Sequence, residues 1–499
     1  MKNIFMLLYY FINKMESMNN FHNSIDSIKE DEKLKKQNLK NPLPIIIIFA
    51  LAVLITVVSV IIVHFCTKKN KTIRSFRYKE KNKKQNIINA KYVLNENQDE
   101  TTLFHSSYND LLESIKVNGI ERNITNTMKL ENGTSNIELK FKNKLSSLEN
   151  LFLNCHNLNE INLYDLSTDS VESTADMFNG CNNLQKINFT DFDTRNIKNI
   201  SNMFSGCEKL TSIDMNIFKH DKLIDIQGVF AGCSGLKTIN IENFNTQNVI
   251  NMSKLFSGCS SLEQIDLDKA ENFKTKNVID MSYMFIDCVN LKNLKLDKFD
   301  TSKVIHMNNM FDKCEKIKNL DLNSFNTKNV EDMFFMFSGC RSLESLNINL
   351  DTSKTVDMFG MFKDSKNLKR INISSFKTSS VEDMGEMFGN CSNLNEIELS
   401  NFDVTKVVSM LGMFEKCESL TSLDLHNFDT QNLEDASYFL SNCKNLKYLD
   451  ISKFTTKNLK NYTYIYENVS SEITIVCNKD IYDTNFGLNN SLNATCKDY

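Results

Sequence analysis

The sequence has no tryptophan, only two prolines and only 14 glycines among its 499 residues. The two prolines, Pro42 and Pro44, both stand just before a long apolar run. Positive and negative side chains nearly balance, with a net charge of −4, which implies no bulk attraction to nucleic acid. The length suffices for several domains or for one long repeat array.

Catalytic signatures are also missing. The sequence has no G-x-x-x-x-G-K phosphate loop, no G-x-S-x-G elbow and no H-E-x-x-H pair. Its seven histidines are scattered, and none is paired with a cysteine at metal-ligand spacing. We therefore expect no enzymatic activity, no cofactor and no metal.

One long apolar run is present near the N-terminus. Ile45 to Val63, IIIIFALAVLITVVSVIIV, contains no charge and is long enough to cross a bilayer as a helix. We expect a transmembrane helix over 43–66, a cytosolic tail over 1–42 and a basic stalk over 67–86. The stalk is rich in Lys and Arg, which by the positive-inside rule favours a cytosolic C-terminal part. Long domains, however, translocate despite flanking charge.

A ladder of cysteines follows the stalk. It consists of Cys155, Cys181, Cys207, Cys233, Cys259, Cys288, Cys314, Cys340, Cys391, Cys417 and Cys443. Ser365 takes the Cys position between Cys340 and Cys391. The interval is constant, except that it is longer between Cys259 and Cys288 and slightly shorter before Ser365. Twelve units with a period of about 26 residues predict a leucine-rich repeat solenoid over 145–460.

Each unit changes its apolar period at the Cys. Val330, Met333 and Phe337 recur at helical spacing, and Leu343, Leu346 and Ile348 follow at the spacing of a strand. We expect an α/β fold with one short helix and one short strand per unit, and Thr327 as the N-cap of its helix. Twelve strands should form one parallel sheet. The Cys is expected to pack as a small apolar residue at the corner.

The unit FNTKNVEDMFFMFSGCRSLESLNI, Phe325 to Ile348, resembles the BspA-type leucine-rich repeats. That resemblance implies a surface protein that recognises macromolecules, as adhesins do. We expect a single-pass type II protein of the plasma membrane, with the solenoid outside the cell and a protein or glycan ligand there. The alternative is a cytosol-facing scaffold tethered to the membrane by the same segment. Nucleic acid is not an expected partner.

Two further segments flank the repeats. Residues 87–144 alternate weakly and are expected to form a small β-rich cap over the first coil, because solenoids need polar ends. Residues 461–499 are expected to form the C-terminal cap. Cys477 and Cys496 both lie within this C-terminal segment, outside the ladder. They form a candidate disulfide outside the cell, with two free thiols as the alternative.

A polar column recurs seven residues after each Cys. Period-2 alternation places it on the open face of the predicted strands. Either it only solubilises the sheet as a hydrogen-bonded ladder, or it is a mildly acidic ligand face. The acidic candidates on that face are Asp214, Asp266, Asp321, Glu398, Asp424 and Asp450.

Overall fold

The computed structural model describes residues 84–95, 100–267, 269–479, 481, 486 and 493–497. The chain divides into two units, Met1–Lys83 and Lys84–Tyr499, and the described residues belong to the second. The expected tail, the transmembrane helix over 43–66 and the stalk up to residue 83 lie outside the described residues. Among the residues that are described, no helix is long and apolar enough to cross a membrane.

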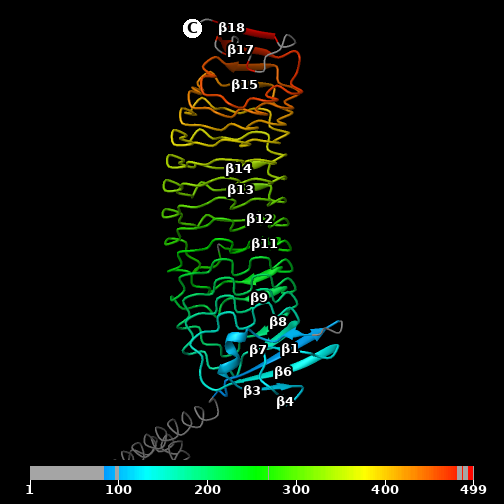
Figure 1. Cartoon of the computed structure of the whole chain (residues 1–499). Helices are drawn as coiled ribbons and strands as arrows, with labels where there is room; N and C mark the ends of the chain where they lie inside the picture. The colour runs from blue at the N-terminus through cyan, green and yellow to red at the C-terminus, as the bar shows by residue number, and fades with distance from the viewer. Residues whose placement is uncertain are drawn as a thin grey trace, which may run out of the picture. The chain divides into compact units, whose positions relative to one another are not determined.

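The described chain begins with an antiparallel β module. Its strands are β1 (Ile87–Leu94), β3 (Leu112–Val117), β4 (Ile120–Arg122) and β6 (Gly133–Phe141), with a 3-10 turn η1 (Ser106–Leu111) and a small β2 (Thr101–Thr102) to β5 (Thr127–Met128) pair. The strand order is β4-β3-β6-β1-β7-β8, in which β7 and β8 belong to the first two coils. Because β1 pairs antiparallel with β7, the module closes the open edge of the first coil (Figure 1).

The repeats form a β-solenoid in which the strands of successive coils stack in parallel (Figure 1). The strands are β7 (Leu158–Asn162), β8 (Lys186–Asn188), β9 (Ser212–Asp214), β10 (Thr238–Asn240), β11 (Gln264–Ile265), β12 (Asn293–Leu294), β13 (Asn319–Asp321), β14 (Ser345–Asn347), β15 (Ser422–Asp424) and β16 (Tyr448–Ile451). β17 (Thr474–Asn478) and β18 (Asn493–Lys497) continue the stack beyond the last repeat.

The expected single sheet of twelve strands is wrong. The coils of Ser365 and Cys391 contain no strand, and the others pair mostly two by two. Most of these strands are very short, so each ladder holds few hydrogen bonds and breaks easily between pairs. The register within a pair is the expected one, with Leu320 opposite Leu346.

The expected short helices are also wrong, because the described part of residues 145–460 contains no helix. The segment before each Cys is instead a run of turns with two left-handed residues. In the coil of Cys340 these are Phe335 at φ 53° and Gly339 at φ 65°, which no continuous helix permits. Some backbone amides there bond to the next coil and others within their own coil. Phe337 N–H donates to the Met361 carbonyl of the next coil at 2.8 Å, whereas Met336 N–H donates to the Met333 carbonyl of its own coil at 3.2 Å.

The threonine that was expected to cap the helix instead joins neighbouring coils. Thr327 is buried, and its hydroxyl donates to the Asp351 carbonyl of the next coil at 2.9 Å. In the preceding coil, the Thr301 hydroxyl both donates to the Asn326 carbonyl at 3.0 Å and accepts from its amide at 2.8 Å. The hydroxyl therefore satisfies backbone groups that a solenoid corner leaves without a ladder partner.

Two side-chain ladders fill the core at the corner. Eleven phenylalanines, from Phe152 to Phe414, stack on one another with ring centroids 5.4 to 6.1 Å apart. Each ladder thiol from Cys181 onward donates to the carbonyl of a phenylalanine in the coil before, as Cys340 does to Phe311 at 3.2 Å. Ser365 makes the same bond to Phe337 at 2.9 Å.

On the turn side, one residue per coil forms an isolated parallel bridge to the next coil, in a series we call the turn-side ladder. Twelve bridges run without interruption from Ser147 to Asn461. Several members are half-buried aspartates, and burial raises the pKa of Asp225, Asp357 and Asp383. The turn-side ladder is thus more continuous than the strands on the opposite side of each coil.

Candidate ligand-binding face

The six acidic residues singled out from the sequence all lie on the strand side of their coils. Asp214, Asp321 and Asp424 are exposed final residues of β9, β13 and β15. Asp266 and Glu398 are exposed, and Asp450 in β16 is half-buried. We call this side, with the residue seven positions after each ladder Cys or Ser365 at its centre, the strand face.

These acids have a local structural role that spacing did not reveal. One oxygen of each accepts a hydrogen bond from a backbone amide just beyond the strand. Asp321 Oδ1 accepts from Asn323 at 3.0 Å, and Glu398 Oε1 accepts from Ser400 at 3.0 Å. Asn188 Oδ1 does the same for Thr190 at 3.0 Å. The column prefers Asp and Asn because their short side chains close this turn. The second oxygen of some acids has its own partner: Asp266 Oδ2 lies 2.6 Å from Lys269 Nζ, and Asp321 Oδ2 accepts from the Asn347 side chain at 3.0 Å.

Three of the six acids occupy consecutive coils and form the acidic trio: Glu398, Asp424 and Asp450. Asp424 and Asp450 are directly opposite in register. Burial favours a higher pKa for Asp424, but hydrogen bonds from the amide and ring of His426 outweigh it and lower that pKa. The remaining three acids are not grouped, because Asn240 lies between Asp214 and Asp266 and Lys295 lies before Asp321.

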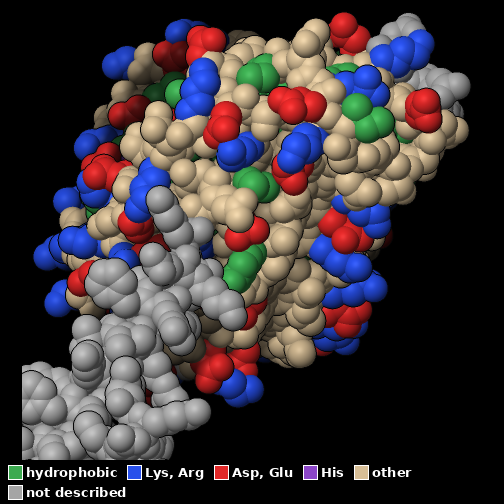
Figure 2. Space-filling view, turned by 90° about the horizontal axis from the view of Figure 1, so that it is seen from below, with side chains coloured by type: hydrophobic (Ala, Val, Ile, Leu, Met, Phe, Trp, Pro, Cys, Tyr) green, Lys and Arg blue, Asp and Glu red, His purple; other side chains and the backbone are tan. Residues whose placement is uncertain are grey.

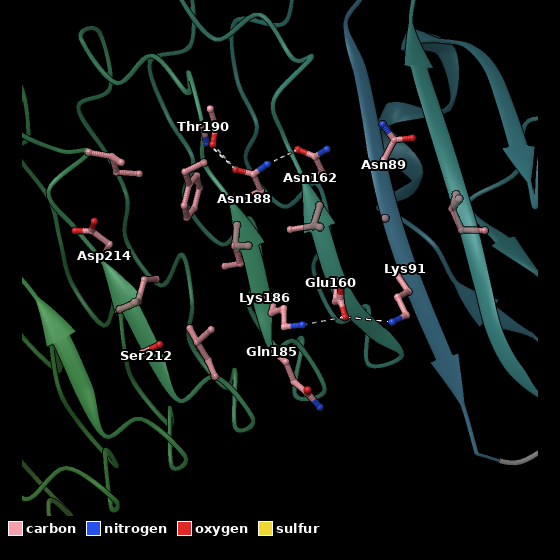
Figure 3. A pocket seen from close by; sticks show the side chains of 18 of the residues that line it. Asn89, Lys91, Glu160, Asn162, Gln185, Lys186, Asn188, Thr190, Ser212 and Asp214 are labelled. Atoms are coloured by element: carbon pink, nitrogen blue, oxygen red, sulfur yellow. Dashed lines mark hydrogen bonds and ion pairs between the residues drawn. The ribbon is translucent and has the colours of Figure 1, made fainter.

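A second feature of the strand face, the junction pocket, lies where the β module meets the first coils. It has a volume of about 1460 Å³ and is lined by residues of β1, β6, β7, β8, β9 and β10. Figure 3 shows its polar side chains, including Asn89 on β1, Asn162 on β7 and Asn188 on β8. Of the six acids, only Asp214 lines this pocket.

Charged groups in the junction pocket neutralise one another. Glu160 lies between two lysines, with Lys91 Nζ at 3.1 Å and Lys186 Nζ at 3.6 Å (Figure 3). The hydrogen bond from Lys91 is the main cause of the lowered pKa of Glu160. Lys116 pairs with Glu138 at 2.6 Å in the same wall. The pocket therefore carries little net charge.

Sequence reasoning missed this pocket because one of its walls comes from outside the repeats. Lys91 and Glu160 are brought together by the antiparallel register of β1 on β7, which periodicity within the repeats does not predict. One signal was available. Phe189 stands where the repeat pattern expects an aliphatic residue, eight positions after Cys181. In the structure Phe189 is half-buried, whereas the residues at this position in the other eleven units are buried.

The eleven ladder cysteines are free and buried. Burial raises the pKa of their thiols, to about 12 in the case of Cys233, so they stay protonated and unreactive at neutral pH. Among the described residues, no group of three His, Cys, Asp or Glu side chains is placed to hold a metal ion. Cys477 is disulfide-bonded, and Cys496 lies opposite it in the β17–β18 register. The Cys477–Cys496 pairing stays a prediction.

Charges of both signs are interspersed on the surface that Figure 2 shows. Many belong to ion pairs between neighbouring coils, such as Lys198 with Glu172 and Lys444 with Glu418, at 2.8 and 2.7 Å. Exposed pairs of this kind add little to stability, typically about 0.2–1 kcal/mol each. Because such mixed charges are found over much of the surface, the features that distinguish the strand face are the acidic trio and the junction pocket.

Comparison with solved structures finds other leucine-rich repeat proteins. One from Bacteroides ovatus is 20% identical with a TM-score of 0.42, and the match covers 74% of this chain and 90% of that one. A leucine-rich cell surface protein from Faecalibacterium prausnitzii is 15% identical with a TM-score of 0.36, covering 72% and 84%. A third, from Eubacterium ventriosum, is 14% identical with a TM-score of 0.30, covering 62% and 85%.

Comparison with curated proteins gives no match. A protein-family model does match, over residues 146–269, 206–288, 264–372 and 356–476. These overlapping matches follow the repeats, because each stretch of coils fits the same pattern again. Together they cover more than half of the chain. The chain therefore belongs to the family described as Mycoplasma protein of unknown function, DUF285.

Proposed function

We propose that this chain is a membrane-anchored binding protein of the cell surface, with BspA-type repeats that recognise other macromolecules. The observation that carries the proposal is the strand face. It presents polar side chains on consecutive coils, spaced by about 4.8 Å as in any sheet. Because most of these side chains are held by a hydrogen bond from the turn that follows, the face is preorganised for binding and loses little entropy when a ligand docks.

The acidic trio gives this face a preference for basic ligands. Three carboxyl groups lie on adjacent coils, and each has a second oxygen beyond the one that closes its turn; that of Asp450 accepts from the Tyr448 hydroxyl at 3.3 Å. Only His426 adds a compensating ring nitrogen, 2.8 Å from Asp424. Basic segments or chains rich in hydrogen-bond donors complement such a surface. We propose that the trio is the contact for a basic macromolecular ligand.

Neutralising the trio tests this assignment. In a Glu398→Gln, Asp424→Asn, Asp450→Asn variant the turn-closing oxygens remain, so folding should be unchanged while three charges are lost. We expect the affinity for an immobilised oligolysine peptide to fall about tenfold, since exposed charges contribute about 0.5 kcal/mol each. The salt dependence of binding should also become weaker. Surface plasmon resonance at several ionic strengths measures both.

The matched control removes the same number of charges from the same column. Asp214→Asn, Asp266→Asn, Asp321→Asn neutralises the three acids that do not lie on consecutive coils. It should weaken oligolysine binding much less. Equal losses in the two variants would mean that only net charge matters. Unchanged binding in the trio variant would mean that the column only closes turns and does not bind the ligand.

Orientation in the membrane decides between the surface protein and the cytosol-facing scaffold. If the segment 43–66 anchors the chain with its repeats outside, protease added to intact cells should digest the repeats. Their protection until the cells are lysed would instead support the scaffold. Immunoblotting with an antibody to the repeat region reads either result.

A further inference from the structure

We propose that the junction pocket binds a neutral oligosaccharide segment. The proposal rests on the proposed function only in taking the strand face as a binding surface, and it concerns different residues from the acidic trio. The pocket spans the first four coils and the β module, whereas the trio lies in the last three coils of the repeat ladder. The pocket also carries little net charge, whereas the trio is acidic.

Size and charge give the first argument. At about 1460 Å³ the pocket exceeds the 300–1,000 Å³ that is usual for sites of single small molecules. It therefore fits several units of a chain. Its lysines Lys91, Lys116 and Lys186 are each paired with Glu138 or Glu160. A ligand with a formal charge would have to compete with these pairs, so a neutral ligand is favoured.

Unused amide groups give the second argument. The pocket is lined by the amide side chains Asn89, Asn136, Asn162, Gln185, Asn188 and Asn240. The oxygen of Asn162 accepts from Tyr164 at 3.1 Å and from Asn188 at 2.9 Å, but among the described residues its NH₂ group has no partner. The side chains of Asn89 and Gln185 likewise have none there. Amides supply both donors and acceptors, which is what sugar hydroxyls require.

A partly exposed apolar patch gives the third argument. Phe189 is half-buried, as are Ile187 and Ile239 beside it on the pocket wall. The Phe189 ring is held by edge-on contacts with Phe192 and Phe204, at 5.3 and 6.2 Å between centroids. A fixed aromatic ring is a platform for the apolar C–H faces of a sugar. Amides beside such a ring complement a ligand that alternates hydroxyl groups with C–H faces.

A peptide fits the pocket less well. The pocket lies on the face of the sheet, where backbone groups of β1, β7 and β8 are already used in ladders. An added peptide strand could pair only between β8 and β9, which belong to different sheets, and these strands of three residues offer few hydrogen bonds. Recognition therefore depends mainly on side chains, and these offer amides and a ring rather than deep apolar holes.

The test uses the full chain in a detergent without a sugar headgroup. It is applied to an array of neutral oligosaccharides, with sialylated and sulfated oligosaccharides, oligolysine and oligoglutamate on the same surface. We expect retention of neutral oligosaccharides over charged ones. That binding should be unaffected by raising the salt from about 0.05 to about 0.5 M, because no net charge is involved. Absence of binding to any neutral oligosaccharide overturns the proposal.

Two variants locate the site. Phe189→Leu restores the aliphatic residue of the other units, and Asn162→Asp keeps the turn-closing oxygen but removes the free NH₂ group. Each should weaken oligosaccharide binding about tenfold. The controls Met215→Leu and Asn372→Asp make matching changes at equivalent repeat positions outside the pocket, and should bind as the native chain does.

Undiminished binding in both pocket variants, with folding intact by circular dichroism, also overturns the assignment. Oligolysine binding is read on the same array and reports on the acidic trio. The oligosaccharide result therefore decides the junction-pocket proposal, and the oligolysine result decides the acidic-trio proposal independently.

Discussion

Replacing Phe337 with alanine is expected to lower the free energy of unfolding by about 3–5 kcal/mol. The ring is fully buried and stacks between Phe311 and Phe362, with centroids at 5.7 and 5.4 Å. Its removal leaves a cavity that the neighbouring coils, tied by backbone bonds on both sides, close only in part. Chemical denaturation of residues 84–499, followed by circular dichroism, measures the loss.

Cys340→Ser is the control for this corner. A serine hydroxyl can make the bond that the Cys340 thiol now makes to the Phe311 carbonyl, as Ser365 already does in its own coil. We expect a loss well below that of Phe337→Ala. A loss as large as that of Phe337→Ala would contradict the packing role assigned to the ladder cysteines.

The second large effect is expected at the left-handed turn positions. Gly339 has φ 65°, and a Cβ there would lie 3.1 to 3.3 Å from Lys313 atoms of the previous coil. A Gly339→Val variant places a β-branched residue in this region and adds a contact tighter than normal. The expected cost is about 2–3 kcal/mol in unfolding free energy. The denaturation experiment described for Phe337 measures it.

Lys313 occupies the equivalent position one coil earlier, at φ 56°. Lys313→Gly relieves the left-handed strain of a residue with a Cβ, while glycine adds freedom to the unfolded chain. The expected result is therefore no loss of stability, or a gain of up to about 1 kcal/mol. A loss in Lys313→Gly similar to that in Gly339→Val would show that backbone conformation is not what selects glycine here.

The repeat period and the apolar columns were sufficient to predict the solenoid, its coil boundaries and the burial of the Cys corner. They did not distinguish helix from turn. Val330, Met333 and Met336 recur at every third position, and a series of turns with bonds such as Met336 to Met333 produces that spacing as well as a helix does. The distinguishing signal was the Gly or Asn just before many ladder cysteines, such as Gly339 and Asn390, which both turn at positive φ.

The placement of the acidic column was predictable to a similar degree. Alternation along the strands was enough to place the acidic column on the open face, as the exposed Asp321 shows. The turn-closing role of its oxygens depends on the chain direction after each strand, which spacing does not report. The junction pocket depends on the pairing of β1 with β7, two segments that lie far apart in the sequence and carry no common pattern.

The turn-side ladder determines how the molecule responds to a pulling force. Its bonds run from coil to coil, along the solenoid axis, because ladder bonds lie perpendicular to the chain direction. Tension between the two ends acts across every interface, but an end coil has a neighbour on one side only, so we expect coils to unravel singly from the ends. Each coil of about 26 residues releases roughly 90 Å of chain when extended. A solenoid held at both ends is therefore expected to lengthen in regular steps under load, while its remaining coils keep their strand faces.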